Sequence, residues 1–326
     1  MTIAAGLAAV AEAVHLEPDR LRARVGDETI EADGARALWS ALSGALYERF
    51  HIGQANDPTI RPGTRDLPLE SALTEAVPHR LSKVLAPVYE QGESSWVVDL
   101  LGVRVRLPAD RVLSLTEQAP GERSLAFAPT GPGQIGRALI QADAIRPTLS
   151  PGFFLVDGSA GTVLGDGPIL RLYVHLAAPA HAAPALRTAL SLLEERELPY
   201  RAKAFSRSSG YPRRDALVIY LEEPAWPALA SLVAALSTAE GLVDDVSAFA
   251  HRVGPGLAIA WDPVDTRVGM RLLSFGEHRA RLVAEALLAA ASGEGTPAEA
   301  LHSSLTRGGV DPALPYRNLS SPALEL

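Results

Sequence analysis

The sequence predicts an α+β fold in which helices pack against a mixed or antiparallel sheet. Two observations carry this prediction. Short strand-like segments alternate with amphipathic helical segments along the second half of the chain, and the first half combines clear helical periodicity with only one strand-like region. We therefore expect a mainly helical N-terminal domain with a small β element, followed by the domain that holds the sheet. Hydrophobic residues make up 47% of the chain and charged residues 21%, as in globular proteins.

The first half contains two predicted helices and one predicted group of strands. Residues 1–25 carry apolar side chains at helical spacing, and residues 35–50 repeat a large apolar residue every fourth position. Alternating apolar and polar residues predict strands within 95–115. Gly, Pro, Asn and Asp gather in 51–67, and Gly and Pro in 118–136, so both segments are expected to be loops.

The second half alternates between strands and helices. The spacing of Ser274 and Glu277 predicts a capping box at the start of one helix. The Pro151-Gly152 step marks a boundary, which divides the chain into residues 1–150 and 151–326. Strands are predicted over 168–176, 200–205, 216–221, 246–251 and 257–261, and helices over 183–196, from 227 onward and from 275 to 291.

Composition excludes several classes of protein. The chain has no cysteine, so disulfides, thiolate zinc sites and cysteine nucleophiles are excluded. A net charge of −8 argues against a nucleic-acid binder, which normally carries a basic face. No apolar run is long enough to cross a bilayer, and the N-terminus lacks the basic start of a secretory signal, so a cytoplasmic protein without membrane contact is expected.

Basic residues are strongly biased toward arginine. Of the 30 Lys and Arg residues, all but Lys83 and Lys203 are Arg. A GC-rich genome explains the general bias. Lysine nevertheless offers chemistry that arginine lacks, because only lysine releases its proton readily enough to act as a base.

Two predicted strands place titratable side chains on one face of the sheet. Side chains alternate along a strand, so Arg171, Tyr173 and His175 share one face, and Arg201 and Lys203 share one face of the next strand. A single helix connects the two strands, which makes them plausible neighbours. As neighbours, they would place His175 and Lys203 on the two sides of one cleft.

Arginines follow these strands closely. Arg207, Arg213 and Arg214 lie in a segment with few acidic residues, and Arg279 lies near the start of a helix, which favours anions. Strand alternation implies that only one of Arg213 and Arg214 faces the cleft. The pattern indicates a phosphate site, although a packed histidine, a solvated lysine and an exposed arginine face are the plainer interpretations of each part. No metal-ligand spacing is present, and no metal site is expected.

Four segments together resemble the HopA-type effector family. They are Arg171–His175, Leu198–Lys203, Tyr211–Tyr220 and Ser274–Arg279, and the resemblance covers roughly 150–290. The family is similar in catalytic logic to the phosphothreonine lyases OspF and SpvC. Relatives of this kind lie in bacterial gene clusters for class V lanthipeptides and thioamitides, where they act after a separate kinase has phosphorylated Ser or Thr of a precursor peptide.

The resemblance implies an activity and roles for individual residues. Lys203 would be the general base and His175 the general acid of a β-elimination that converts phosphoserine or phosphothreonine to dehydroalanine or dehydrobutyrine. Residues 151–326 would form the lyase domain. Residues 1–150 lie outside the resemblance, and three roles stay open for them: docking of the peptide, docking of the kinase, or only shaping the cleft. The partners would be the phosphorylated precursor peptide and a Ser/Thr kinase-like protein, with no cofactor. The phosphate contacts would come from Arg171, Arg207, Arg213, Arg214 and Arg279.

Three other functions remain open from the sequence. A non-catalytic subunit would bind the precursor peptide or the kinase and use the basic site only to hold a phosphorylated segment. A secreted effector would act on host signalling proteins. A phosphatase would return a hydroxyl group where a lyase leaves an alkene.

Overall fold

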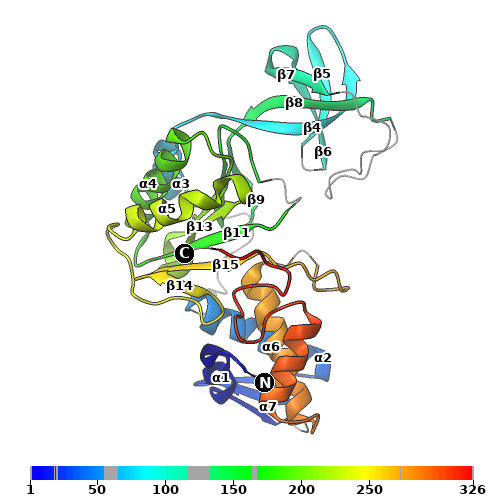
Figure 1. The fold of residues 1–326 in the computed structure, drawn as a ribbon, viewed down its shortest axis with the longest axis vertical. Coiled ribbons are helices and arrows are strands. Elements are labelled where there is room, and N and C mark those ends of the chain that lie inside the picture. The colour runs from blue at the N-terminus through cyan, green and yellow to red at the C-terminus, as the bar shows by residue number, and fades with distance from the viewer. Residues whose placement is uncertain are drawn as a thin grey trace.

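The computed structural model describes residues 2–17, 19, 21–54, 65–100, 102–116, 133–163, 167–271 and 273–324. Three parts follow one another along its long axis (Figure 1). A five-stranded sheet lies at one end, a seven-stranded sheet occupies the middle, and helices from both ends of the chain gather with a three-stranded sheet at the other end. The described strands pair only in antiparallel fashion, so the prediction of an α+β fold with an antiparallel sheet is confirmed.

The seven-stranded sheet contains every candidate residue that was predicted on a strand. Its strand order is β14-β15-β11-β13-β12-β10-β9. The strand β13 therefore lies between β11 and β12, and the prediction that these two strands are direct neighbours is wrong. The strands are β9 (Ile145–Ser150), β10 (Phe153–Asp157), β11 (Leu170–Leu176), β12 (Arg201–Phe205), β13 (Arg213–Leu221), β14 (His251–Gly254) and β15 (Leu257–Trp261).

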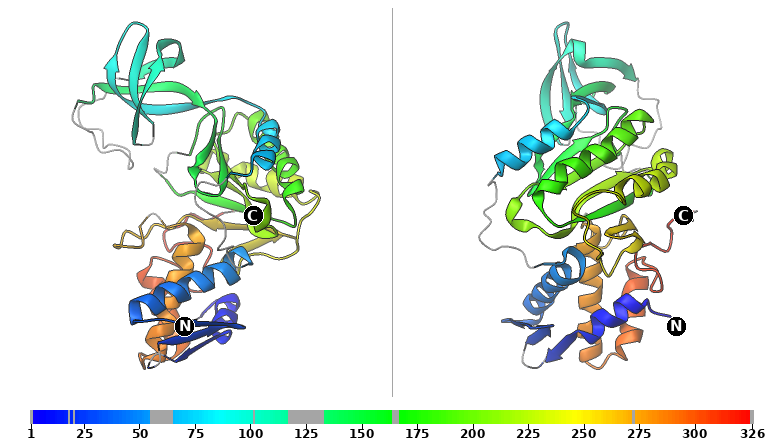
Figure 2. Two further views of the ribbon diagram at one scale, coloured as in Figure 1. Left: turned by 180° about the vertical axis from the view of Figure 1, so that it is seen from behind. Right: turned by 90° about the vertical axis from the view of Figure 1, so that its left-hand side faces the viewer.

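One face of this sheet is apolar and carries three helices. Figure 2 shows α3 (Leu67–Ala76), α4 (Ala182–Glu195) and α5 (Leu229–Leu236) packed side by side on it. Alternate residues of β11 (Leu170, Leu172) point into the core beneath these helices, as strand periodicity requires. Removal of this apolar surface from water is the main stabilising contribution in this part of the molecule.

The opposite face of the sheet meets the N-terminal and C-terminal helices. Tyr173, Val218 and Ala260 from three strands join one hydrophobic core with residues from both ends of the chain. The first 50 residues thus share a core with helices that follow residue 274. The elements of this part are α1 (Ala5–Glu12), β1 (Val14–Glu17), β2 (Arg22–Val25), β3 (Glu28–Glu31), α2 (Ala35–Leu46), a π-helical turn η2 (Tyr47–Ile52), α6 (Phe275–Ala291) and α7 (Pro297–Arg307).

The five-stranded sheet has a small core of its own. Its order is β6-β5-β4-β8-β7, and the long strands β4 and β8 pair over eight residues each. Buried residues such as Val88, Trp96 and Ile140 fill its interior. The strands are β4 (Leu81–Gln91), β5 (Ser95–Leu100), β6 (Val103–Pro108), β7 (Val112–Thr116) and β8 (Gly136–Asp143).

These sheets correct the prediction of a mainly helical N-terminal domain. The predicted helix over 1–25 ends at Glu12, because the following short segments pair into β1–β3. The strands β4 and β8 were missed, and α3 begins at the end of the predicted loop over 51–67. Residues 55–64 of that loop, and 118–132 of the loop predicted over 118–136, lie outside the described residues. The division into domains at residue 150 stays a prediction.

Several predicted elements are confirmed. The helices predicted over 35–50, 183–196 and 275–291 correspond to α2, α4 and α6, and Ser274 and Glu277 form the predicted capping box. The strand over 257–261 coincides with β15, whereas the strand predicted over 246–251 is wrong, because β14 begins only at His251. Within the described part of the chain, no helix combines the length and apolarity that a membrane crossing requires.

Candidate functional site

The strand register brings Lys203 and Arg171 to the same face of the sheet. Tyr220 of β13 pairs with Arg171 of β11 on one side and with Arg201 of β12 on the other. In the neighbouring row, Val218 pairs with Tyr173 and with Lys203. Because paired residues point to the same face, all of these side chains stand on the face opposite to α3, α4 and α5.

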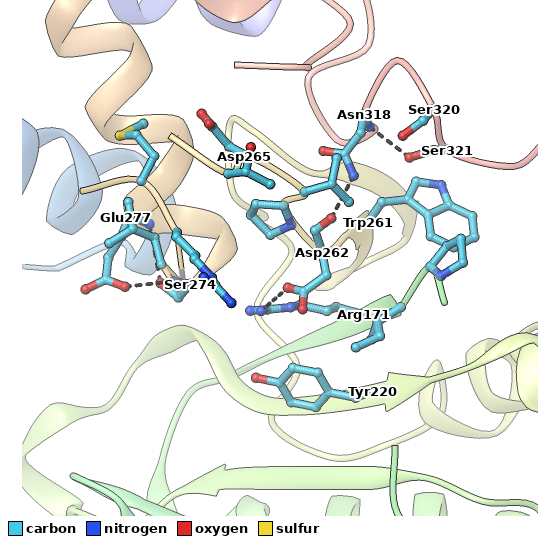
Figure 3. A pocket seen from close by; sticks show the side chains of 18 of the residues that line it. Arg171, Tyr220, Trp261, Asp262, Asp265, Ser274, Glu277, Asn318, Ser320 and Ser321 are labelled. Atoms are coloured by element: carbon cyan, nitrogen blue, oxygen red, sulfur yellow. Dashed lines mark hydrogen bonds and ion pairs between the residues drawn. The ribbon is translucent and has the colours of Figure 1, made fainter. Parts of the chain in front are cut away.

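A pocket of about 790 Å³ opens over this face. Figure 3 shows how the strand residues Arg171 and Tyr220 form its floor, while the loop that leads into α6 and the C-terminal segment around Asn318 form its walls. Sequence segments far apart in the chain thus meet there. The lining comprises Gly167, Pro168, Ile169, Arg171, Lys203, Tyr220, Trp261, Asp262, Pro263, Val264, Asp265, Thr266, Met270, Arg271, Leu273, Ser274, Glu277, Asn318, Ser320 and Ser321.

Lys203 contributes an ammonium group held by aromatic rings. Its Nζ lies 4.3 Å from the centroid of the Phe153 ring and 5.8 Å from that of Tyr220. Cation–π attraction of this kind orients an ammonium group without neutralising it. Among the residues that the structure describes, no carboxylate lies within ion-pair distance of Nζ. The group is therefore available to a ligand.

Arg171 is a buried cation at the floor of the pocket. Its guanidinium group forms an ion pair with Asp262 and lies 4.8 Å from the centroid of the Tyr220 ring. Burial opposes the charge, but the Asp262 carboxylate together with the Tyr220 and Tyr173 side chains outweighs burial and raises the pKa of Arg171 above its usual value. The backbone oxygen of Asp262 accepts a hydrogen bond of 2.7 Å from the Asn318 side chain, which ties the C-terminal segment to this pair.

Two residues of this pocket were missed by the sequence analysis. Arg271 is exposed at the wall, and its guanidinium group has no hydrogen-bond or ion-pair partner within the described ranges. The Tyr220 hydroxyl likewise has no hydrogen-bond partner among described residues. Alternation along β13 would have placed Tyr220 on the polar face, but the register against Arg171 and Lys203 was needed to single it out.

Beside the pocket, the same face is closed by an aromatic cluster. The His51 ring of η2 contacts Tyr173 edge-on at 5.4 Å between centroids, and Phe275 of α6 at 5.8 Å. His51 Nδ1 lies 2.9 Å from the Ser247 hydroxyl. Burial lowers the pKa of His51 to about 3, so the ring is neutral. This cluster covers Tyr173, the residue between Arg171 and His175.

A buried ion pair lies next to this cluster. Arg213 donates two hydrogen bonds to Asp215, at 2.5 and 3.2 Å, and its guanidinium carbon lies 4.3 Å from the centroid of Phe205. Burial opposes ionisation of Asp215, but Arg213 lowers the pKa of that carboxyl below its usual value. Both groups are charged, and each provides the counter-charge and the hydrogen bonds of the other. Arg213 is thus engaged by the protein itself.

His175 and Arg214 belong to a third arrangement, which is centred on Asp245. His175 Nδ1 lies 2.9 Å from the backbone oxygen of Asp245, so this nitrogen donates a proton to it. The Asp245 carboxylate accepts a hydrogen bond of 2.7 Å from Arg214 Nε. Burial lowers the pKa of His175. Neither His175 nor Arg214 is among the residues that line the pocket.

The remaining two predicted phosphate contacts also lie outside the pocket lining. Arg279 is fully buried and donates a hydrogen bond of 2.7 Å to the backbone oxygen of Pro315 and another of 3.2 Å to Asn318. Burial lowers the pKa of Arg279 to about 9. Arg207 is half-buried, with its Nε close to Gly152 and without a partner among described residues. Of the predicted site residues, the structure therefore brings Lys203 and Arg171 together in one pocket.

Comparison with known proteins places this arrangement in a family. The model of the HopA1 effector protein family matches residues 144–317, which include β9 to β15 and α6. The chain belongs to the HopA1 effector protein family. The matched range contains Lys203, Arg171, Tyr220 and Arg271, and it extends beyond both ends of the segment in which the resemblance was seen.

Two solved structures of effector proteins are similar to this chain. The first, from Pseudomonas syringae pv. tomato strain DC3000, has 20% sequence identity and a TM-score of 0.41, and the match covers 51% of this chain and 62% of that one. The second, from Pseudomonas syringae pv. syringae strain 61, has 15% identity and a TM-score of 0.46, and covers 88% of this chain and 90% of that one. No curated protein matches the sequence.

Proposed function

We propose that this member of the HopA1 effector protein family eliminates phosphate from phosphoserine or phosphothreonine in a peptide, with Lys203 as the base. The substrate would be a ribosomal precursor peptide phosphorylated by a separate kinase-like protein, as the resemblance implies. The observation that carries the proposal is the pocket itself. It presents the Lys203 amine beside a buried guanidinium group, and no carboxylate of the described residues pairs with that amine.

The base has to remove the Cα proton of the phosphorylated residue. A lysine can do so only as a neutral amine, and a carboxylate partner would hold it in the charged form. The aromatic contacts of Lys203 position Nζ over the floor of the pocket, and none of the described carboxylates pairs with it. An arginine at this place would not serve, since it keeps its proton.

Two cations are placed to hold the phosphate group. Arg271 places a guanidinium group without a partner among the described residues at the pocket wall, and Arg171 supplies a fixed positive charge at the floor. A guanidinium group can donate two parallel hydrogen bonds to the oxygens of one phosphate, and its charge stabilises the negative charge that develops on the leaving group. Asp262 holds Arg171 in place, so its contribution to the ligand is mainly electrostatic.

The acid role of His175 stays a prediction from the resemblance. Its ring lies outside the lining of this pocket, and its Nδ1 is engaged by Asp245. Arg213, Arg214 and Arg279 likewise use their guanidinium groups within the protein. Arg207 alone among the predicted arginines outside the pocket has a nitrogen without a partner among described residues.

A product analysis tests the proposal. The purified protein is incubated with matched peptides that contain phosphoserine, phosphothreonine or the unmodified residue, and the products are analysed by mass spectrometry and by addition of a thiol. We expect loss of phosphoric acid and a product that the thiol alkylates, because a dehydroamino acid is an electrophilic alkene. Recovery of the free hydroxyl would identify a phosphatase, and an unchanged phosphopeptide that co-purifies with the protein would identify a binding subunit.

A further inference from the structure

The acid and the base of this elimination have to stand close together. The base attacks the proton on Cα, and the acid protonates the oxygen on Cβ, so only one carbon–carbon bond separates the two points of attack. General acid–base catalysis requires each group to lie within hydrogen-bond reach of its target. The partner of Lys203 should therefore be another group of the same pocket floor.

His175 does not meet this condition. The strand β13 lies between β11 and β12, so the backbones of His175 and Lys203 are about 10 Å apart across the sheet. His175 also lies two positions beyond Tyr173, the residue level with Lys203, which adds about 7 Å along the strand. The ring of His51 covers Tyr173 in between.

Tyr220 meets it. Its ring lies between the two cations of the floor, 5.8 Å from Lys203 Nζ and 4.8 Å from the guanidinium carbon of Arg171, measured to the ring centroid. Figure 3 shows the Tyr220 side chain running along the floor below the Arg171 guanidinium group. Its hydroxyl lines the pocket side of β13 and has no hydrogen-bond partner among the described residues. A phenol donates a proton as well as accepting one.

We propose that Tyr220 is the proton donor to the leaving oxygen; this inference rests on the proposed lyase function. Lys203 takes the proton from Cα as the Cβ–O bond breaks, and the electron pair of that bond goes to the bridging oxygen. The Tyr220 hydroxyl gives its proton to this oxygen, and hydrogen phosphate leaves. Arg171 stabilises the tyrosinate, which regains a proton from solvent as the Lys203 ammonium group releases one.

A change of leaving group tests the role of Tyr220. Peptides with phosphoserine and with O-sulfoserine present similar tetrahedral anions, but sulfate is a far weaker base than phosphate and leaves without a proton. The kcat of wild type, Tyr220→Phe and His175→Ala is measured on both peptides. Tyr89→Phe is the matched control, because Tyr89 also lies under an arginine but belongs to the five-stranded sheet.

We expect Tyr220→Phe to lose about a hundredfold or more in kcat on phosphoserine and to change far less on sulfoserine. If Tyr220→Phe loses kcat equally on both peptides, Tyr220 only positions the substrate. If His175→Ala, and not Tyr220→Phe, loses kcat on phosphoserine alone, His175 is the acid. Either result overturns the inference while leaving the lyase intact. If the wild-type protein forms no alkene, the proposed function itself is wrong. Binding of phosphopeptide to Tyr220→Phe is the control that this variant is folded.

Discussion

The polar face of the seven-stranded sheet has two ends that differ in how they use their charged side chains. At the end formed by Arg213, Asp215 and His51, Arg213 and Asp215 pair with each other and the His51 ring is neutral. These side chains are buried beneath helices. At the end formed by Lys203, Tyr220 and the pocket, several donors have no partner among described residues. Between the two ends, the pairing of β11 with β13 shifts register, so simple alternation along β13 does not run through both. Only the second retains hydrogen-bonding capacity that a ligand can use.

The largest expected effect concerns the base at the open end. Lys203→Arg should retain phosphopeptide binding and lose at least about a hundredfold in turnover, because a guanidinium group keeps its proton. Lys83→Arg is the matched control, since Lys83 is the other lysine of the chain and is exposed on β4. Single-turnover formation of alkene and equilibrium binding of the phosphopeptide measure the two effects. Full activity of Lys203→Arg would remove Lys203 from the mechanism.

At the closed end, the Arg213–Asp215 pair should matter for stability. Asp215→Asn leaves the buried Arg213 charge without its counter-charge and should lower the free energy of unfolding by about 3–5 kcal/mol. Urea denaturation measures this loss in the free energy of unfolding. The matched control is Asp244→Asn, which breaks an exposed pair with Arg252 and should cost less than about 1 kcal/mol. Similar losses in both variants would mean that burial does not distinguish the two pairs.

The pH dependence of stability also belongs to the closed end. The pKa of His51 is about 3 in the folded protein, below the ordinary histidine value of about 6.5. Below pH 6.5 the unfolded chain binds a proton that folded His51 does not, so stability falls as the pH falls, by about 1.4 kcal/mol per pH unit for this group. Urea denaturation between pH 7 and 4 should show this slope, and His51→Gln should make it shallower. An unchanged slope in that variant would exclude His51 as its source.

The smallest effect concerns phosphate recognition at the open end. Arg271→Gln should raise the KM for phosphopeptide about tenfold, because it removes one charge-assisted hydrogen bond from an exposed wall. The free energy of unfolding should not change, because the Arg271 side chain has no partner among the described residues to lose. Arg106→Gln, at an exposed pair on the five-stranded sheet, is the control. A KM that stays at the wild-type value would place the phosphate elsewhere in the pocket.

Local patterns in the sequence were sufficient for much of the secondary structure. Periodic apolar residues located α2, α4 and α6, and the capping box at Ser274 gave the start of α6. Local patterns failed in the first half, where β1 to β3 are only four residues long each and the partner of β4, β8, lies 48 or more positions along the chain. Four residues are too few for a two-residue period to stand out, and strand preference depends strongly on the neighbouring strand.

What the sequence by itself determined about this protein is the alternation that places Arg171 and His175 on one face of their strand and Arg201 and Lys203 on one face of theirs, together with a lysine where arginine prevails. Only the tertiary structure decided which of these polar residues can meet a ligand. The insertion of β13 between β11 and β12 separated His175 from Lys203, and the loop before α6 brought Arg271 to the pocket. The reason is physical: alternation depends on the backbone alone, whereas availability depends on which partners the folded chain brings within hydrogen-bond distance.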